Sequence, residues 1–440
     1  MIDDIDDADD VDVDVVVAGA GLAGLVTATE LVASGLSVRV LEASDRIGGR
    51  TLSRRLGGAA FDFGGQWILP TQQRMLALTA KLGIELTPQR RDGHTVTVRN
   101  GARKVDAGLL AKLPPLHAIE LAYRVWQLER LQTRTGRVAD VSLADWIDTN
   151  VRATKAREAL AMLAQLTFAV EPAELSLRSF LEATAATGGL LGRDEFEDGV
   201  VAMRCVGGAQ QICERLAAAL PEQVVLNCEI TGVDRLGESV AVHTAAGTHN
   251  ARRAVLAMPP PAVSRLSIEP GLDQLADTLL LGPIIKCVAT YDARFWTDDG
   301  FAGEAYSTDG TVRAVVDVSA EGVQPALMAF IVGETAREWS RRTADERRAQ
   351  VLDELAAFFG EHARTPTEFS EMDWLAAPHS QGCVGVFGVG GDADDWAQAR
   401  QPAGHLYFAS ADTAADWPGH MEGAVEAGER TAARVLSSLD

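Results

Sequence analysis

The sequence predicts an α/β fold with two interleaved domains, and three observations support this prediction. An apolar run at Val13–Ala18, a glycine-rich turn, a helical pattern and a second apolar run at Val38–Leu41 follow one another directly, as in a parallel β-α-β unit. The 440 residues are too many for one ordinary hydrophobic core. From about Leu86 helical patterns dominate, and strand-like segments return after residue 201. We therefore expect a Rossmann-like domain interleaved with an α+β domain of mixed sheet and helices.

The turn after the first strand has the spacing G-x-G-x-x-G, with Gly19, Gly21 and Gly24 at the glycine positions. Gly19 permits the tight turn, Gly21 lets a pyrophosphate approach the backbone, and Gly24 lets the helix pack closely on the strand. The free amides at the helix start then face the phosphates. Glu42 ends the second strand, eighteen residues after Gly24, where it can accept hydrogen bonds from an adenosine ribose. An ordinary glycine turn is the alternative, but the whole unit favours a dinucleotide site.

A second glycine pair follows Glu42 in the run Arg46–Thr51, which reads R-I-G-G-R-T. A nicotinamide dehydrogenase does not need this pair and its arginine, whereas an extended FAD must pass close to backbone there. The run resembles the flavoprotein family that includes monoamine and polyamine oxidases, L-amino-acid oxidases and phytoene desaturases. FAD is therefore the predicted cofactor.

Other segments resemble the flavin-binding parts of the amine oxidases. Phe61–Ile68 matches the segment that runs along the flavin, although a plain glycine turn with a packed tryptophan is the alternative. Ile230 matches an adenine contact, and a helix that begins near Gly419 would place its positive end at the flavin. Beyond the first turn and Glu42, the predicted cofactor contacts are Ala43, Gly49, Arg50, Gly64, Gly65, Gln66, Trp67, Ile230, Ala411, Asp412 and Met421.

Three residues are catalytic candidates: Lys286, Trp374 and His420. Lys286 is the one cation in the apolar strand Ile284–Tyr291, where it either extends to solvent from an edge strand or, as the resemblance implies, holds a water at flavin N5. Trp374 matches a tryptophan near the flavin. His420 stands where the family has a tyrosine of an aromatic cage, and it either serves a polar substrate or has a structural role at a helix start.

Cys383 and Val384 stand at two further functional positions of the family. In the mitochondrial monoamine oxidases the matching cysteine bonds covalently to FAD, and the next residue is the other cage tyrosine. Cys383 matches, which leaves a covalent bond and a plain buried thiol both open. Val384 departs from the pattern, as His420 does. The loss of both tyrosines puts ordinary primary arylalkylamine substrates in doubt.

Composition limits the partners and the cellular location. The net charge is −22, with eight aspartates among the first fourteen residues, which argues against nucleic acid and anionic membranes as partners. No basic signal sequence and no run of eighteen apolar residues is visible. The five cysteines lack the spacing of a metal site and read as reduced thiols. We expect a cytoplasmic protein without a bound metal.

Changes in pattern predict the domain boundaries. The acidic residues 1–12 are expected to form a disordered tail. The loop Leu190–Val201 either lines the substrate entrance through its acids or is an ordinary solvated loop. The FAD-binding domain is predicted to comprise residues 13–85, 202–270 and 395–440, and the substrate-binding domain residues 86–201 and 271–394.

The resemblance implies an FAD-dependent amine oxidase. Hydride would pass from the α-carbon of an amine to flavin N5, and the imine would hydrolyse to an aldehyde or ketone. Dioxygen would reoxidise the flavin and give hydrogen peroxide. Two alternatives remain open: a flavin desaturase or porphyrinogen-type oxidase acting on C–C bonds, and a non-catalytic flavin-binding protein. The sequence defines neither the amine nor the oligomeric state, and a homodimer is compatible with it.

Overall fold

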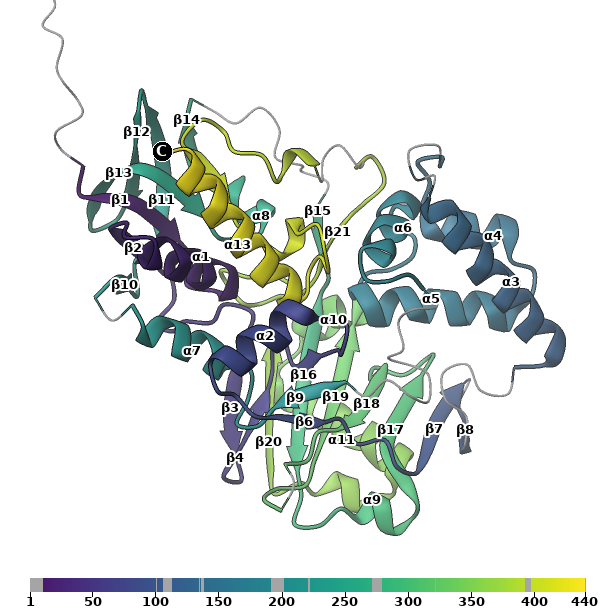
Figure 1. Ribbon diagram of the computed structural model, residues 1–440. Helices are drawn as coiled ribbons and strands as arrows, with labels where there is room; N and C mark the ends of the chain where they lie inside the picture. Colours follow the sequence, from purple (N-terminus) through teal and green to yellow (C-terminus); the bar gives the residue numbers. More distant parts are fainter. Residues whose placement is uncertain are drawn as a thin grey trace, which may run out of the picture.

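A computed structural model describes residues 11–99, 101–105, 113–133, 135, 138–190, 202–220, 222–270, 279–320, 322–391 and 397–439. Two large sheets organise these residues, with a group of helices beside them (Figure 1). The predicted tail lies almost wholly outside the described residues, and so does the predicted entrance loop apart from Leu190. No helix in the described ranges is long and apolar enough to cross a membrane.

The first sheet contains the predicted β-α-β unit. Its strand order is β10-β2-β1-β13-β12-β11-β14, with β22 also paired to β13. Strands β10, β2, β1, β13 and β22 run parallel. At their centre, residues 15–18 of β1 are apolar and buried, as is typical of a parallel strand covered on both faces. The strands are β1 (Val13–Ala18), β2 (Val38–Leu41), β10 (Val224–Val225), β11 (Ile230–Leu236), β12 (Ser239–Thr244), β13 (Gly247–Leu256), β14 (Ser267–Glu269) and β22 (Leu406–Phe408).

Three helices from distant parts of the chain pack together on this sheet. They are α1 (Leu22–Ala33), α7 (Gln210–Ala218) and α13 (Met421–Ser437). Figure 1 shows α1 and α13 side by side, and a Cβ added to Gly428 on α13 would lie 2.8 Å from the carbonyl oxygen of Ala23 on α1. The close approach of these two helices brings the two ends of the chain together.

The second sheet has the order β20-β16-β19-β18-β17-β7-β8 and is antiparallel except for the pairing of β17 with β7. One face packs on α11 (Ala344–Phe359), which begins at a capping box formed by Thr343 and Glu346, and α10 (Gly333–Ser340) lies beside it. The other face packs on the segment around Phe61 and Phe63. The strands are β7 (His94–Arg99), β8 (Ala102–Val105), β16 (Ile284–Thr290), β17 (Phe301–Ser307), β18 (Ala314–Asp317), β19 (Ala326–Val332) and β20 (Glu368–Asp373).

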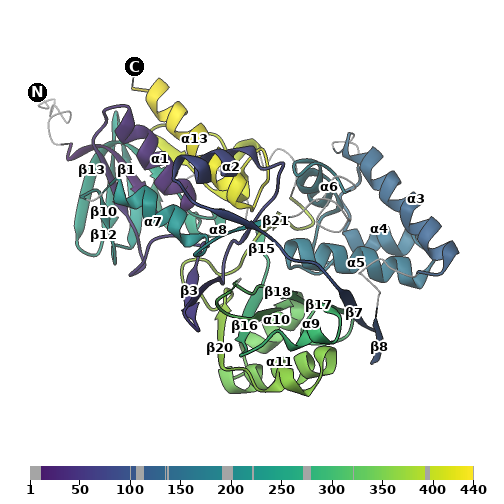
Figure 2. The same ribbon diagram turned by 60° about the horizontal axis from the view of Figure 1, so that its bottom comes forward.

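Four helices form a separate layer at one end of the second sheet, as Figure 2 shows from another side. They share a core around Leu160, Phe168 and Phe180. The helices are α3 (Pro115–Gln132), α4 (Leu143–Asn150), α5 (Thr154–Phe168) and α6 (Leu177–Ala185). All four lie in residues 86–201, where helical patterns were expected to dominate.

Small elements connect the sheets. A hairpin of β3 (Ser53–Leu56) and β4 (Ala59–Asp62) leads into residues 63–66, the glycine segment, which contains Gly64 and Gly65. The chain continues through β5 (Trp67–Ile68) into α2 (Gln73–Lys81). The remaining connecting elements are β6 (Leu86–Pro88), β9 (Met203–Cys205), α8 (Pro260–Val263), β15 (Leu279–Leu281), α9 (Phe295–Asp298) and β21 (Gly385–Phe387).

The α/β fold class is confirmed, with one local correction. Residues 86–201 were expected to be mainly helical, but β6, β7 and β8 lie within that range. Strand β7 reads H-T-V-T-V-R and joins the second sheet beside β17, so long-range pairing stabilises a short alternating segment. The same pairing supports the proposed union of residues 86–201 and 271–394, although the division into domains stays a prediction.

Candidate active site

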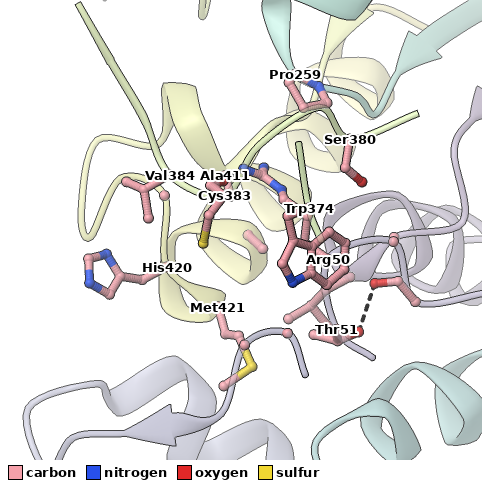
Figure 3. Close-up of a pocket in the computed structure, with 18 of the residues that line it drawn as sticks. Arg50, Thr51, Pro259, Trp374, Ser380, Cys383, Val384, Ala411, His420 and Met421 are labelled. Carbon is pink, nitrogen blue, oxygen red and sulfur yellow. Dashed lines mark hydrogen bonds between the residues drawn. The ribbon is translucent and has the colours of Figure 1, made fainter. Parts of the chain in front are cut away.

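A cavity of about 790 Å³ lies between the first sheet and the second sheet. Candidate residues from distant parts of the chain line it. The close-up shows Arg50, Trp374, Cys383, His420 and Met421 around the cavity (Figure 3). Seventeen of the nineteen candidate residues line the cavity: Gly19, Gly21, Glu42, Ala43, Gly49, Arg50, Gly64, Gly65, Gln66, Trp67, Ile230, Lys286, Trp374, Cys383, Ala411, His420 and Met421. Gly24 and Asp412 lie outside the lining.

The first glycine turn leaves open space at one position only. Gly19 has a φ of 113°, and a Cβ there would lie 2.6 Å from the carbonyl oxygen of Ala257. A Cβ on Gly24 would lie 2.0 Å from the carbonyl oxygen of Gly19, which explains why this glycine serves packing. Gly21 has no such neighbour, since the nearest atom to its Cβ would be Gly49 Cα at 3.9 Å. The backbone at Gly21 is thus open to the cavity at the start of α1.

Glu42 is fixed at the end of β2 by two backbone amides. Its Oε2 accepts a hydrogen bond from Ala20 N at 2.7 Å, and its Oε1 accepts one from Ser44 N at 2.9 Å. Each carboxylate oxygen keeps further acceptor capacity toward the cavity. This arrangement suits acceptance of two vicinal hydroxyl groups, as the ribose prediction requires.

Arg50 is anchored by a residue 362 positions away in the chain. Its Nη1 and Nη2 donate to the two carboxylate oxygens of Asp412 at 2.8 and 2.6 Å. Burial disfavours the guanidinium charge, but attraction and hydrogen bonds from Asp412 outweigh it and raise the pKa of Arg50. Asp412 also accepts a hydrogen bond from Gly385 N. It therefore positions Arg50 and the start of β21 without lining the cavity itself.

Lys286 lies inside the second sheet, between β20 and β19, so the alternative of an edge lysine is wrong. Its side chain is 5% exposed, and Nζ donates to the carbonyl oxygen of Gly64 at 2.6 Å. The rings of Trp67 and Phe330 lie 5.6 and 5.3 Å from Nζ. Burial lowers the pKa of Lys286 to about 8, although the thiol of Cys383 and the carboxylate of Asp62 partly oppose this.

The glycine segment is held from both sides and presents its backbone to the cavity. Trp374 Nε1 donates to the carbonyl oxygen of Phe63 at 2.7 Å, next to the carbonyl that accepts from Lys286. A Cβ on Gly64 would lie 2.0 Å from the carbonyl oxygen of Arg50. Gln66 is buried, and its Oε1 has no hydrogen-bond partner among the described residues. A buried acceptor beside glycine backbone fits a flat polar ring such as that of a flavin.

The C-terminal helix begins at the cavity. Met421 is the first residue of α13, and His420 precedes it with its Nδ1 2.9 Å from the carbonyl oxygen of Pro418. The His420 ring also lies edge-on to Trp417 at 5.3 Å. A Cβ on Gly419 would lie 2.5 Å from Val384 Cγ1, so the two departures from the family's cage, Val384 and His420, are neighbours (Figure 3).

Sequence reasoning missed the wall that the second sheet provides. One cross-strand row, Lys286, Phe330, Ala314 and Tyr306, lines the cavity. Two residues before Tyr306, Glu304 also lines it, and Arg91 faces Glu304 from the loop before β7. The sequence shows that Glu304 and Tyr306 stand two residues apart and so share a face of any strand there. It does not show that this strand pairs with β18 and β7 and thereby places both residues at the cavity.

Comparisons with known families, sequences and solved structures also indicate a flavin-binding protein. A model of the family described as flavin containing amine oxidoreductase matches residues 22–436. A protein of Mycobacterium tuberculosis named as a flavin-containing monoamine oxidase is 34% identical, with 97% of each chain covered. The putrescine oxidase of Kocuria rosea is 32% identical over 97% of this chain and 95% of its own length. The solved structure of a wild-type putrescine oxidase with bound putrescine has a TM-score of 0.90 at 30% identity, covering 97% of this chain and 99% of that chain.

Proposed function

The chain belongs to the family of flavin-containing amine oxidoreductases, and on that basis we propose how its cavity carries out the reaction. The protein is an FAD-dependent amine oxidase. The observation that carries the proposed site is the convergence of the first glycine turn, the segment from Gly64 to Trp67 and the start of α13 on one cavity. When bound there, FAD supplies the acceptor for a hydride from the amine α-carbon.

The cofactor contacts divide by their chemistry. The start of α1 and the open backbone at Gly21 would hold the pyrophosphate, while Glu42 would accept from the adenosine ribose. Gly64 and Gly65 would lie along the flavin ring, with the start of α13 near its electron-rich edge. The buried Oε1 of Gln66 supports this placement because a bound ring can give it a donor.

Lys286 and the aromatic wall are the proposed reaction machinery. Lys286 Nζ donates one hydrogen bond to the carbonyl oxygen of Gly64, and another of its N–H groups can donate to a water. Because its pKa is about 8, Nζ exists in both protonation states near neutral pH and can exchange a proton with that water. Trp374 fixes the flavin segment through Phe63, and Trp67 with Phe330 forms an apolar wall that excludes bulk water from the substrate.

Anaerobic mixing of the purified holoprotein with primary, secondary and cyclic amines tests this proposal. We expect bleaching of the oxidised flavin band with at least one class, and its return with peroxide release when dioxygen is admitted. Bleaching by unsaturated hydrocarbons or porphyrinogens and by no amine would favour the C–C oxidising alternative. Bound flavin that no reductant of either kind bleaches would favour the non-catalytic alternative.

Cys383 is the residue we propose for a covalent bond to FAD. It lines the cavity next to Arg50 and Ala411, as Figure 3 shows. Burial raises the pKa of its thiol, and the positive charges of Lys286 and Arg50 oppose that rise and so favour the thiolate that forms such a bond. Acid precipitation of the wild type should leave the yellow colour with the polypeptide, whereas Cys383→Ala should release it. Cys228→Ala, which changes the cavity thiol at the Ile230 end, is the matched control and should keep the colour bound. Release of flavin from the wild type would contradict the bond.

The electron acceptor, the oligomeric state and the cellular location are also proposals. Dioxygen is the proposed electron acceptor, and a homodimer is the proposed assembly. All five cysteines are free, which supports a reducing, cytoplasmic location. The strands of the first sheet all come from the proposed cofactor-domain segments, and those of the second sheet all come from the proposed substrate-domain segments. This supports the proposed division into domains.

A further inference from the structure

The end of the cavity away from Lys286 carries two opposite charges. Arg91 Nε lies 3.5 Å from Glu304 Oε1, and both side chains line the cavity. The Glu304 side chain is only 13% exposed, whereas Arg91 is an exposed residue whose side chain is 35% accessible, so the carboxylate is largely withdrawn from solvent and the guanidinium is not. Burial raises the pKa of Glu304, while Arg91 and a hydrogen bond from Thr95 oppose that rise. On this sheet-lined side of the cavity, Lys286 is the other charged side chain among the described residues.

The sheet sets the separation between the two ends. Glu304 stands on β17, and Lys286 stands on β16, with β18 and β19 between them. Three strand spacings of about 4.8 Å each, with the offset of two residues along β17 between Tyr306 and Glu304, give about 16 Å between the Cα atoms. The floor between them is apolar, because it consists of Phe330 and Ala314 in one row and Val316 in the next. A substrate that reaches both ends therefore needs an apolar chain between two polar groups.

A lone second ammonium fits this end poorly. Near Glu304 it would also meet the guanidinium of Arg91, which lies 3.5 Å from the same carboxylate. Like charges at such a distance repel, and the low exposure of Glu304 limits how far water screens that repulsion. A head group with both charges avoids this cost, since its ammonium pairs with Glu304 while its carboxylate pairs with the planar fork of Arg91.

We propose that Glu304 binds the α-ammonium and Arg91 binds the α-carboxylate of a basic α-amino acid whose terminal side-chain amine is the group oxidised. The length of lysine fits: six bonds of about 1.5 Å, in a zigzag, separate its two nitrogens by roughly 7 Å. A hydrogen bond of about 2.8 Å to Glu304, and two more of about 2.8 Å each through one water between the terminal amine and Lys286, bring the reach to about 15 Å. The proposal rests on the proposed amine oxidation and specifies its substrate class.

Four matched amines separate the contributions of the head group. L-lysine carries both charges, 1,5-diaminopentane only the ammonium, 6-aminohexanoate only the carboxylate, and pentylamine neither. The rate of anaerobic flavin bleaching at limiting concentration should be highest for L-lysine, by about tenfold or more over pentylamine. The two singly charged compounds should react more slowly than L-lysine.

Two variants and a control assign the charges. Arg91→Gln should lower kcat/KM for L-lysine about tenfold relative to 1,5-diaminopentane, mainly through KM, and Glu304→Gln should lower it for both compounds relative to pentylamine. Arg90→Gln is the control, because Arg90 lies outside the cavity lining and its Nε faces Asp92 at 3.5 Å. It should keep the wild-type ratio of L-lysine to pentylamine.

A binding measurement does not depend on turnover. L-norleucine has the same head group and no terminal amine, so titration calorimetry with the holoenzyme should show binding that Arg91→Gln weakens about tenfold. L-norleucine should compete with pentylamine and should not bleach the flavin. Bleaching by L-norleucine would place the α-amine at the flavin and overturn the proposal.

The remaining outcomes distinguish this proposal from the function it rests on. If pentylamine or the diamine bleaches the flavin as well as L-lysine does, the head-group site is refuted while amine oxidation stands. A preference for 1,5-diaminopentane over L-lysine would likewise overturn it in favour of an ammonium site. If none of the four amines, nor any other amine, bleaches the flavin, the proposed function itself fails.

Discussion

Replacement of Gly21 by alanine is expected to abolish high-affinity FAD binding while the apo chain stays folded. An added Cβ meets nothing closer than Gly49 Cα at 3.9 Å, so the protein itself accommodates it. The methyl group would occupy the space where a pyrophosphate must approach the amides at the start of α1. We expect FAD affinity to fall by about 100-fold or more, because the hydrogen bonds of a charged group are lost.

The measurement is reconstitution of the apo protein with FAD, followed by flavin fluorescence, together with thermal unfolding of the apo form. Gly24→Ala is the matched control, since its Cβ would lie 2.0 Å from the carbonyl oxygen of Gly19. This variant should lower the free energy of unfolding of the apo protein by about 1–3 kcal/mol or more through overpacking. Gly21→Ala protein that keeps wild-type FAD affinity would contradict the placement of the cofactor.

Replacement of Lys286 by methionine is expected to slow the reaction of the bound flavin by about 100-fold, with the larger effect on reoxidation by dioxygen. The ammonium lies 2.6 Å from the carbonyl oxygen of Gly64, at the centre of the proposed flavin contact. A positive charge at that place stabilises the negative charge that develops when dioxygen accepts electrons. Methionine has similar length and no charge, so it fills the same space between Trp67 and Phe330.

The pH dependence gives an independent check. Burial lowers the pKa of Lys286 to about 8, so Nζ is mainly charged below that pH and mainly neutral above it. The wild-type reoxidation rate should therefore fall as the pH rises through about 8, and Lys286→Met should lack this transition.

Stopped-flow measurement of reduction and reoxidation across this pH range decides the matter. Lys81→Met is the control, because Lys81 is exposed on α2. Unchanged rates in both half-reactions of Lys286→Met would remove Lys286 from the mechanism.

Local patterns made much of the cofactor site predictable. The turn from Gly19 to Gly24 follows an apolar strand and opens a helix, and each of these features depends on residues close together in the chain. The same holds for the helices and for the capping box at Thr343. The fold class, the cofactor and the amine oxidase family could therefore be inferred and are confirmed by the family and structural matches.

The partners of the charged residues were decided only by tertiary structure. Nothing near Arg50 in the sequence indicates Asp412, and nothing near Lys286 indicates whether its strand lies inside the sheet or at an edge. Arg91 and Glu304 meet only because β7 pairs with β17. Periodicity fixes which face a residue occupies within its own element, whereas the neighbour across that face depends on which strands pair. The sequence by itself thus determined a flavin-binding amine oxidase, and the folded chain determined which charges lie along its substrate cavity.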